Sequence, residues 1–275
     1  EETFRRENEG TGRSIDFQEL DRDYYQFIIW DKAKKQIVGG QRIGVISELV
    51  PSYSLDPSMR GVGPTQKRGV FPKLYTSESI DYSSLIYGEY FSFGAEISRT
   101  FIRPEYQNEP FPLAVLWSGL GQFLVRNSNI RYLLGTVSIS GDLHPDSVRV
   151  IIGYTLKNHS SEKGKIVFPR KPVRIQGERS EEQIQEIIGR IKNAKGLEQE
   201  ISAIEGSNGV KLNPLIKAYI AKGAKFLVWN HDAEFNTFDA LIEDDLPHQP
   251  LRALKGYLGV DGAMSYLRDN GIVAE

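Results

Sequence analysis

Residues 91–99, FSFGAEISR, alternate between apolar and small or polar side chains, which is the period of a strand with one buried face. Residues 113–126 follow with apolar side chains three and four positions apart, the pattern of a helix with one buried stripe. Residues 132–140, YLLGTVSIS, read as the next strand. A strand, a helix and a strand in this order predict a right-handed βαβ unit and therefore an α/β fold.

Further elements extend outward from this unit. Residues 25–30 (YQFIIW) and 37–46 (IVGGQRIGVI), joined by a polar connector, predict a hairpin on its N-terminal side. We expect a single domain over residues 1–247, followed by a peripheral, amphipathic helical tail over residues 248–275. Before the tail, the sequence predicts a capped helix over residues 180–204, a helix over 214–222 and a strand over 225–230.

The composition excludes several classes of protein. The chain has 275 residues and no cysteine, which rules out a disulfide scaffold, a thiolate zinc site and a cysteine nucleophile. Its 34 Lys and Arg nearly balance 36 Asp and Glu, so a general nucleic-acid binder is not expected. Apolar runs stay far below the roughly 18 residues that span a bilayer, and we expect a soluble, cytoplasmic globular protein. The chain opens with Glu1 rather than Met, which predicts that an N-terminal helix or a partner domain precedes it.

The sequence also lacks the familiar motifs of metal and nucleotide sites. Its four histidines are scattered without the spacing of metal ligands, so we expect no metal site. It has no G-x-S-x-G elbow, no P-loop and no G-x-G-x-x-G after a strand. Hydrolase, NTPase and dinucleotide-binding functions therefore have no positive support.

Glu96 is the most informative single residue. A carboxylate in the middle of an apolar strand does not sit in a core without partners. It either forms a structural ion pair with Arg99 or lines a cleft, where it binds or deprotonates an amine. In a regular strand Glu96 and Arg99 point to opposite faces, so their pairing would require a local bulge.

Two further polar segments lie next to predicted strands. Thr136, Ser138 and Ser140 share one face of their strand, where they either line a cavity or are simply tolerated in an edge strand. Residues 231–239 follow the last strand, either as a capped turn or as a loop that contacts substrate.

Together, these segments resemble a known family. The chain is similar, over about residues 3–245, to the GNAT-like hemolysin or ornithine-lipid N-acyltransferase group. It most resembles a Bacteroidetes-type branch in which this domain is often fused behind a lysophospholipid acyltransferase domain. The segments that carry the resemblance are residues 3–5, 10–16, Asp21, 30–31, 38–42, 96–99, 104–106, the helix with Trp117, 135–140, 214–219, 223–224 and 232–239.

The resemblance implies a GNAT-like fold with a mixed central sheet flanked by helices. It also implies transfer of a 3-hydroxyacyl chain from acyl carrier protein to the α-amine of an amino acid such as ornithine or glycine. By analogy, Glu96 orients or deprotonates the amine, and Arg99 holds that carboxylate or contacts the donor. Ser98, Thr136, Ser138 and Ser140 are expected along the acyl or pantetheine channel, and Asp21, Arg42, Asp232, Asn236 and Asp239 at the acceptor.

One departure from ordinary acetyl-CoA-dependent GNAT enzymes bears on the donor. Where those enzymes have a glycine-rich pyrophosphate loop, residues 106–112 have two prolines and no glycine. This favours an acyl-phosphopantetheine donor on acyl carrier protein over acyl-CoA, with no tightly bound cofactor. That carrier is acidic, so a basic stretch is a candidate docking surface, although it could instead touch anionic lipid at the membrane periphery or simply be solvated. Its basic residues are Lys157, Lys163, Lys165, Arg170, Lys171 and Arg174.

Two alternatives stay open at this point. The same fold could perform a different acyl transfer, such as that of the more distant acyl-homoserine-lactone synthases, which share the Glu96-x-x-Arg99 pattern. It could also be a non-catalytic binding module, although the presence of Glu96, Arg99 and the serine face argues against that.

Overall fold

The computed structural model describes residues 17–49, 74–82, 88–109, 111–206 and 212–272. The chain divides into two compact units. The first comprises Glu1–Ser77, Ser83–Gly135 and Asp245–Glu275, and the second Glu78–Tyr82 and Thr136–Asp244. The expected boundary at residue 247 therefore does not separate the two units.

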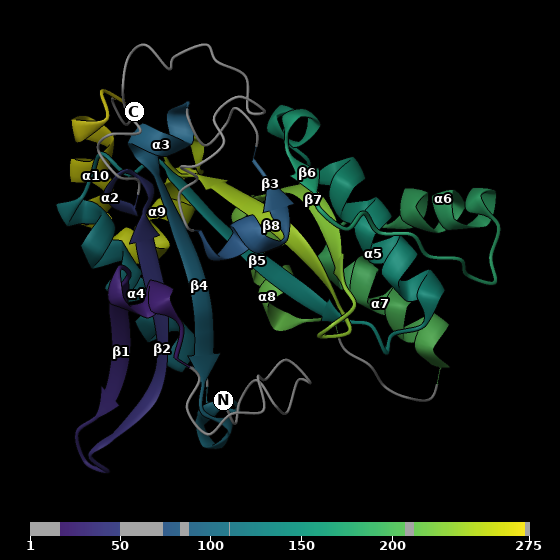
Figure 1. Ribbon diagram of the computed structural model, residues 1–275, viewed down its shortest axis with the longest axis horizontal. Helices are drawn as coiled ribbons and strands as arrows, with labels where there is room; N and C mark the ends of the chain where they lie inside the picture. Colours follow the sequence, from purple (N-terminus) through teal and green to yellow (C-terminus); the bar gives the residue numbers. More distant parts are fainter. Residues whose placement is uncertain (1–16, 50–73, 83–87, 110, 207–211, 273–275) are drawn as a thin grey trace. The chain divides into compact units, whose positions relative to one another are not determined.

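A mixed sheet runs through the fold in the order β1-β2-β4-β5-β8-β7 (Figure 1). Strand β5 is shared, because Tyr132–Gly135 belong to the first unit and the rest of the strand to the second. The predicted parallel pair is present: β4 and β5 run side by side from Gly94↔Tyr132 to Ile97↔Gly135. Gly135 is required there, because a Cβ would come within 2.8 Å of the Ile97 carbonyl oxygen.

In the first unit, β1 and β2 form the predicted antiparallel hairpin and β2 pairs with β4. Helix α4 packs against the hairpin, with the ring of Phe123 5.4 Å from that of Phe27. The elements of this unit are β1 (Tyr25–Asp31), β2 (Gln36–Val45), α2 (Ile46–Leu49), α3 (Glu89–Phe93), β4 (Gly94–Ile102), α4 (Pro112–Arg126), α9 (Leu251–Leu258) and α10 (Val260–Asp269), with 3-10 helices at Glu19–Arg22, Tyr75–Glu78, Pro104–Tyr106 and Leu246–His248.

Helices α9 and α10 form the C-terminal segment that was predicted as an amphipathic tail. They are not peripheral, because Leu254, Leu258 and Tyr266 are buried in the core of the first unit. The Tyr266 hydroxyl also donates a hydrogen bond to the Ile130 carbonyl oxygen at 2.5 Å. Burial of these apolar side chains makes the segment an integral part of its unit.

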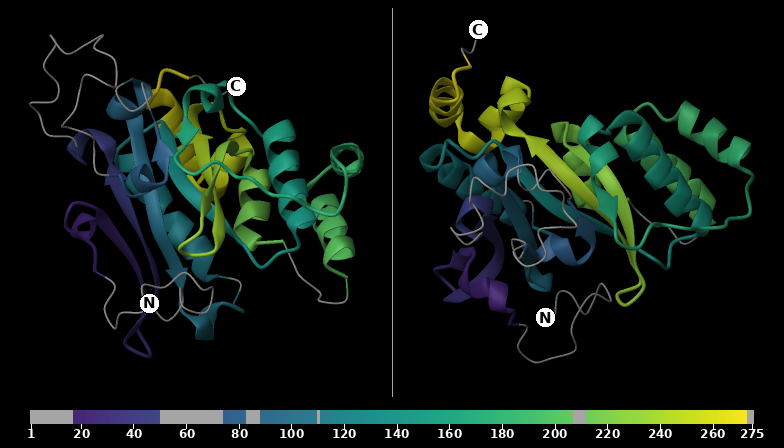
Figure 2. Two further views of the ribbon diagram at one scale, coloured as in Figure 1. Left: turned by 45° about the vertical axis from the view of Figure 1, so that its right-hand side comes forward. Right: turned by 45° about the horizontal axis from the view of Figure 1, so that its top comes forward.

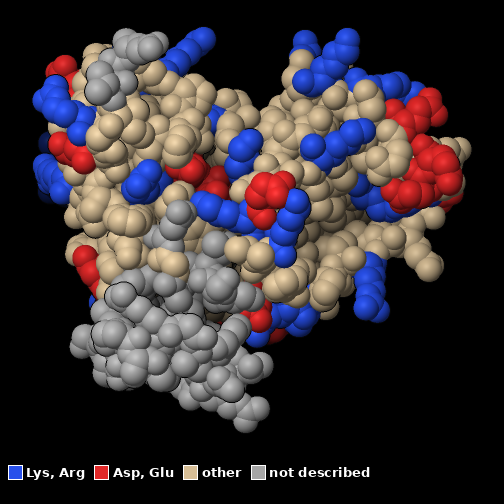
Figure 3. All heavy atoms as spheres, turned by 90° about the horizontal axis from the view of Figure 1, so that it is seen from above, with Lys and Arg blue, Asp and Glu red and all other residues tan. Residues whose placement is uncertain are grey.

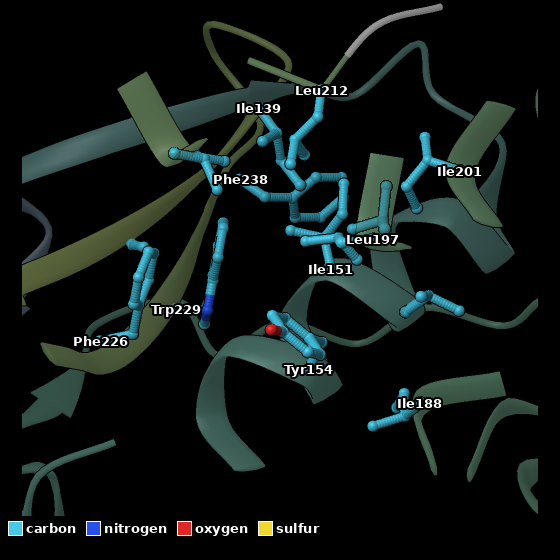
Figure 4. Close-up of a cluster of buried hydrophobic side chains, with 14 of the residues drawn as sticks. Ile139, Ile151, Tyr154, Ile188, Leu197, Ile201, Leu212, Phe226, Trp229 and Phe238 are labelled. Carbon is cyan, nitrogen blue, oxygen red and sulfur yellow. The ribbon is translucent and has the colours of Figure 1, made fainter. Parts of the chain in front are cut away.

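In the second unit, β7 and β8 form an antiparallel hairpin. Helices α5 to α8 cover its core, in which the rings of Phe226 and Trp229 stack at 6.2 Å (Figure 4). The Trp229 indole N–H donates to the Thr155 hydroxyl at 3.1 Å, so its only polar group is satisfied. The elements are β3 (Ile80–Asp81), the end of β5 (Tyr132–Ser140), α5 (Pro145–Asn158), β6 (Phe168–Pro169), α6 (Glu181–Arg190), α7 (Ala194–Glu205), α8 (Pro214–Lys222), β7 (Lys225–Asp232) and β8 (Thr237–Asp245), with a 3-10 helix at Glu162–Ile166.

Two differences from the expected elements stand out. The predicted helix over residues 180–204 is two helices, α6 and α7, and Asn193 caps the second through its bond from the Gly196 N–H. Strand β8 was not predicted: it begins at Thr237, within the segment 231–239 that was expected to be a turn or a loop. Figure 2 gives two further views of these elements. Within the described residues, no helix is long and apolar enough to cross a membrane.

Candidate active site

Glu96 sits at the centre of a buried polar cluster in the first unit. Its side chain on β4 is fully buried and lies in register with Gly44 on β2. The carboxylate accepts hydrogen bonds from the backbone N–H groups of Tyr75 at 2.8 Å and Thr76 at 2.9 Å. The hydroxyls of Tyr24 and Thr76 donate two more. Each carboxylate oxygen therefore accepts two hydrogen bonds, which satisfies a charge that would otherwise be costly to bury.

The local sequence of β2 positions the phenol above this carboxylate. A Cβ at Gly44 would lie 2.6 Å from the Tyr24 ring, so only glycine lets the ring lie over the strand. Burial, the charge of Glu96 and the hydrogen bond to it raise the pKa of the Tyr24 hydroxyl well above its usual range. Tyr24 therefore remains protonated and acts as a donor to Glu96 at all physiological pH values.

Arg42 is the cation that the structure places beside this cluster. Its guanidinium is buried between two aromatic rings, 5.0 Å from the centroid of Tyr24 and 5.3 Å from that of Tyr75. It donates hydrogen bonds to the Ser98 hydroxyl at 2.8 Å, to the Asp21 carboxylate at 2.5 Å and to the Gln18 side-chain oxygen at 2.9 Å. Such a fork of donors combined with ring stacking suits Arg and not Lys.

The structure thus brings four of the predicted site residues together. Glu96, Ser98, Arg42 and Asp21 form one connected polar cluster across β4, β2 and the 3-10 helix before β1. Asp21, predicted at the acceptor, is the ion-pair partner of Arg42. Its side chain is only partly buried, which leaves one end of the cluster open to solvent.

A β-bulge interrupts β4 directly after this cluster. Arg42 pairs with Ser98 and Gly40 with Phe101, so two residues of β4 stand opposite one residue of β2. Arg99 in this bulge has φ +51°, the left-handed region that a non-glycine residue rarely adopts. A bulge of this kind re-aims the side chains that follow it and is frequent next to functional sites.

In the second unit, the buried Asp239 and the partly buried Ser138 form a separate polar pair. Asp239 on β8 accepts hydrogen bonds from Ser138 and, at 3.0 Å, from the Thr237 hydroxyl. Burial raises the pKa of the Asp239 carboxyl despite these two bonds. Of the other hydroxyls on the β5 face, Thr136 is partly buried and Ser140 is exposed and accepts a bond from the Asp142 N–H.

The other two predicted acceptor residues build the turn between β7 and β8. Asp232 accepts hydrogen bonds from the N–H groups of Glu234 at 3.0 Å and Phe235 at 3.3 Å. Asn236 has φ +51° and donates to the Asp142 carboxylate at 2.8 Å. These are the contacts of a capped turn, the simpler of the two interpretations offered for residues 231–239.

The basic stretch of the second unit is partly neutralised. Lys163 pairs with Glu243 at 2.9 Å, and Lys165 pairs with Glu162 at 2.5 Å. Basic and acidic side chains lie interspersed over the face shown in Figure 3, so no field of a single sign covers it. Across the described ranges, no group of three or more His, Asp or Glu side chains could hold a metal ion. The exposed basic side chains of the stretch are Lys157, Lys165, Arg170, Lys171 and Arg174.

Several residues of the cluster were not predicted from the sequence. Tyr24, Tyr75, Thr76 and Gln18 all contact Glu96 or Arg42. Tyr75 and Thr76 follow a long Pro-, Ser- and Gly-rich stretch without periodicity, so the sequence holds no local signal for them. The motif segments in residues 3–16 lie outside the described residues.

Comparison with known proteins agrees with this architecture. Residues 1–118, which contain Arg42, Glu96 and Arg99, match the family model described as an acetyltransferase (GNAT) domain. The fold class is that of GNAT proteins. This confirms the predicted α/β fold with a mixed central sheet flanked by helices.

Two curated relatives bear the name glycine N(alpha)-acyltransferase. The protein from Bacteroides thetaiotaomicron is 30% identical over 230 residues, which cover 79% of this chain and 62% of that protein. The protein from Phocaeicola vulgatus is 29% identical over 182 residues, or 63% of this chain and 51% of that protein. The chain thus spans between half and two thirds of the length of these relatives. No solved structure matches the chain.

Proposed function

We propose that this chain is the GNAT-like part of an N-acyltransferase that joins an acyl chain to the α-amine of an amino acid. The observation that carries the proposal is the buried Glu96–Arg42 cluster, which lies within the part of the chain that matches a GNAT domain. The names of the two relatives favour glycine as the acceptor, with ornithine as the other amino acid suggested by the resemblance. The product would be a lyso-aminolipid.

The reaction forms one amide bond and breaks one thioester. The amine nitrogen attacks the thioester carbonyl carbon, the carbon–sulfur bond breaks, and the thiol leaves with a proton. The attacking amine must lose a proton, and Glu96 is the proposed base, acting directly or through water. Because its oxygens already accept four hydrogen bonds, one donor must yield for this to happen. The Thr76 hydroxyl is the donor proposed to rotate away, whereas the Tyr24 hydroxyl and the two backbone N–H groups keep their bonds to the carboxylate.

The other predicted site residues are proposed to bind the acceptor and the donor around Glu96. Arg42 and Asp21 are proposed to hold the acceptor, because Asp21 forms the partly exposed end of the cluster and is paired with the buried Arg42. Arg99 in the bulge is proposed to contact the donor or the Glu96 carboxylate. Ser98, Thr136, Ser138 and Ser140 remain proposed for the acyl or pantetheine channel, and Asp239 for the acceptor; Asp232 and Asn236 are explained by the turn they build.

The proposed donor is an acyl-phosphopantetheine carried on acyl carrier protein. Residues 106–112, which precede and open α4, contain no glycine, and Pro112 has no N–H to offer a pyrophosphate. A phosphopantetheine monophosphate depends less on such a loop than the pyrophosphate of acyl-CoA does. Lys157, Lys171 and Arg174 are exposed and are proposed to meet the acidic carrier.

The remaining proposals concern the cellular setting. An acyltransferase of this type would act on the cytoplasmic side, at or near the inner membrane, where a lipid product is delivered. Membership of the hemolysin or ornithine-lipid branch, and fusion to a lysophospholipid acyltransferase domain, are proposed on the sequence resemblance alone.

The decisive experiment mixes the folded protein with 3-hydroxyacyl-carrier protein or acyl-CoA and a panel of amino acids, and detects N-acyl products by mass spectrometry. We expect product with the carrier-protein donor and with glycine or ornithine. Tyr24→Phe removes one charge-assisted hydrogen bond to Glu96 and should lower kcat/KM about tenfold to a hundredfold. The matched control Tyr25→Phe removes an exposed bond to Glu48 and should leave kcat/KM unchanged. If the folded protein makes no N-acyl product with any combination of acyl donor and amino acid, the proposal is contradicted and a non-catalytic module is favoured.

A further inference from the structure

The β1–β2 hairpin of the first unit exposes three large apolar side chains. Ile28 is 58% exposed, Trp30 54% and Ile37 39%, whereas β2 is buried from Val38 onward. Single exposed apolar residues are ordinary, but a contiguous group that includes a tryptophan indicates an interaction surface.

Strand pairing places the three side chains on one face of the hairpin. Trp30 pairs directly with Ile37, so their side chains share a face. Alternation along β1 puts Ile28 on the same face as Trp30. Phe27 points to the opposite face, where it packs against Phe123 of α4. The exposed side chains thus form an apolar strip, defined as Ile28, Trp30 and Ile37, that is turned away from α4.

The turn at the end of this hairpin is basic. Residues 31–36, DKAKKQ, contain three lysines and one aspartate. The Asp31 carboxylate is occupied in the turn, because it accepts hydrogen bonds from the Ala33 and Lys34 N–H groups at 2.9 Å each and from the Tyr106 hydroxyl at 2.9 Å. Lys34 lies 4.7 Å from the centroid of the Tyr106 ring, while Lys32 and Lys35 are exposed. The tip of the apolar strip therefore offers cations to a partner.

We propose that the β1–β2 hairpin docks on an anionic phospholipid bilayer through the apolar strip and Lys32 and Lys35. A tryptophan side chain prefers the boundary between headgroups and acyl chains, and neighbouring aliphatic side chains enter the same layer. Lysines beside them keep their ammonium groups at the phosphates while their stems cover apolar surface. The positive charges of Lys32 and Lys35 favour an anionic bilayer over a neutral one. The hairpin tip lies at the opposite end of the first unit from α10, and within that unit it projects outward (Figures 1 and 2).

The docked face is also the face of the polar cluster. Gln26 pairs with Arg42, and Arg42 with Ser98, so these positions lie on the same side of the sheet as Ile28 and Trp30. A bilayer bound to the strip would therefore lie on the same side of the sheet as the proposed acceptor site. This consequence rests on the proposed acyl transfer, whereas the docking itself does not.

The test measures binding of the full chain to vesicles by co-sedimentation. We compare pure phosphatidylcholine with phosphatidylcholine containing about 30% phosphatidylglycerol, in about 0.1 M salt. We expect binding to the anionic vesicles to exceed binding to the neutral ones about tenfold, because each lysine near the surface adds to the attraction. Trp30 fluorescence should shift to shorter wavelength on binding, and brominated lipid should quench it.

Two variants and one control separate the contributions. The double variant Ile28→Ser, Trp30→Ser should lose most binding to both vesicle types, and Lys32→Glu, Lys35→Glu should lose only the preference for anionic lipid. The control Val260→Ser removes an aliphatic side chain that is 60% exposed on α10 of the same unit, and it should bind like the unmodified chain. Circular dichroism verifies that each variant is folded.

Three outcomes would overturn the proposal. The unmodified chain could fail to bind either vesicle, or the hairpin variants could bind as well as Val260→Ser. In the third outcome, the strip mediates self-association through the edge strand β1 instead of lipid binding. The unmodified chain would then form a dimer that does not bind vesicles, and Trp30→Ser would dissociate this dimer. Vesicle binding requires no substrate, so failure here leaves the proposed acyl transfer standing, and failure of acyl transfer leaves the docking standing.

Discussion

Glu96→Gln is the substitution that best tests the described cluster, because it preserves shape and removes only the charge and one acceptor. The carboxylate offers one oxygen to the Thr76 N–H and hydroxyl and the other to the Tyr24 hydroxyl and the Tyr75 N–H. The amide of glutamine turns one of these acceptors into an NH2 donor. Whichever way it is oriented, the NH2 then faces one backbone N–H that cannot rotate away.

The magnitude follows from that count. The hydroxyl at the affected oxygen can rotate and accept from the NH2, so one backbone donor is left unsatisfied, at about 1–3 kcal/mol. The bonds that remain are neutral and lose part of the strength that the charged acceptor gave them. We therefore expect the free energy of unfolding of the first unit to fall by about 2–4 kcal/mol. This is large against the stability of a typical domain, so a loss of turnover in Glu96→Gln is interpretable only alongside its stability.

The assay combines urea unfolding with hydrogen exchange. To follow each compact unit by itself, fluorescence from Trp30 and Trp117 in the first unit is distinguished from that of Trp229 in the second by single Trp→Phe replacements. The local readout is exchange of the Tyr75 and Thr76 amides, which should lose protection in Glu96→Gln. Glu48→Gln is the matched control, since its exposed carboxylate accepts one bond from Tyr25 at 3.1 Å. An unfolding free energy within about 0.5 kcal/mol of the unmodified chain, with both amides still protected, would refute the reasoning.

Three further predictions concern the rest of the fold. Gly135→Ala places a Cβ 2.8 Å from the Ile97 carbonyl oxygen and should cost about 1–3 kcal/mol in urea unfolding, with a smaller effect contradicting the tight β4–β5 pairing. Although burial raises the pKa of the Asp146 carboxyl, hydrogen bonds from two arginines outweigh it and hold that pKa below its ordinary value. The stability that Asp146 gives the second unit should therefore be present above about pH 4 and disappear as the pH falls below it, and Asp146→Asn should abolish that dependence. Burial lowers the pKa of Lys222 to about 7, although the negative charge of Asp244 acts in the opposite direction and raises it. Because the unfolded lysine holds its proton up to about pH 10, the second unit should gain stability from pH 7 to pH 10, and Lys222→Met should flatten that rise.

The sequence predicted well the elements whose signal is local. The alternation in β4, the helical stripe of α4 and the turn between β1 and β2 each depend on neighbouring side chains, and all three elements are present. The strand predicted over residues 91–99 was wrong at its start, because residues 91–93 end helix α3 and β4 begins at Gly94. Strand β8 was not predicted, because Asp239 and Glu243 give its sequence the appearance of a polar segment. Both acids are buried and satisfied by residues remote in the chain: Asp239 by Ser138, and Glu243 by Lys163 at 2.9 Å. A buried polar strand has no periodic signature when its partners come from elsewhere.

Glu96 shows where prediction from the sequence ends and what the structure adds. That a carboxylate within an apolar strand requires partners follows from the cost of burying charge, and this holds in the structure. Which partners it finds does not follow, because Tyr24 lies 72 residues away and Thr76 lies 20 residues away in the chain. The identity of those partners sets the chemistry. An ion pair with Arg99 would hold the carboxylate in a salt bridge. With two backbone N–H groups and two hydroxyls as partners instead, the carboxylate can exchange the Thr76 hydroxyl for an incoming amine. The four bonds to Glu96, three of which fix residues 75–76 to β4, thus determine whether Glu96 can act as a base.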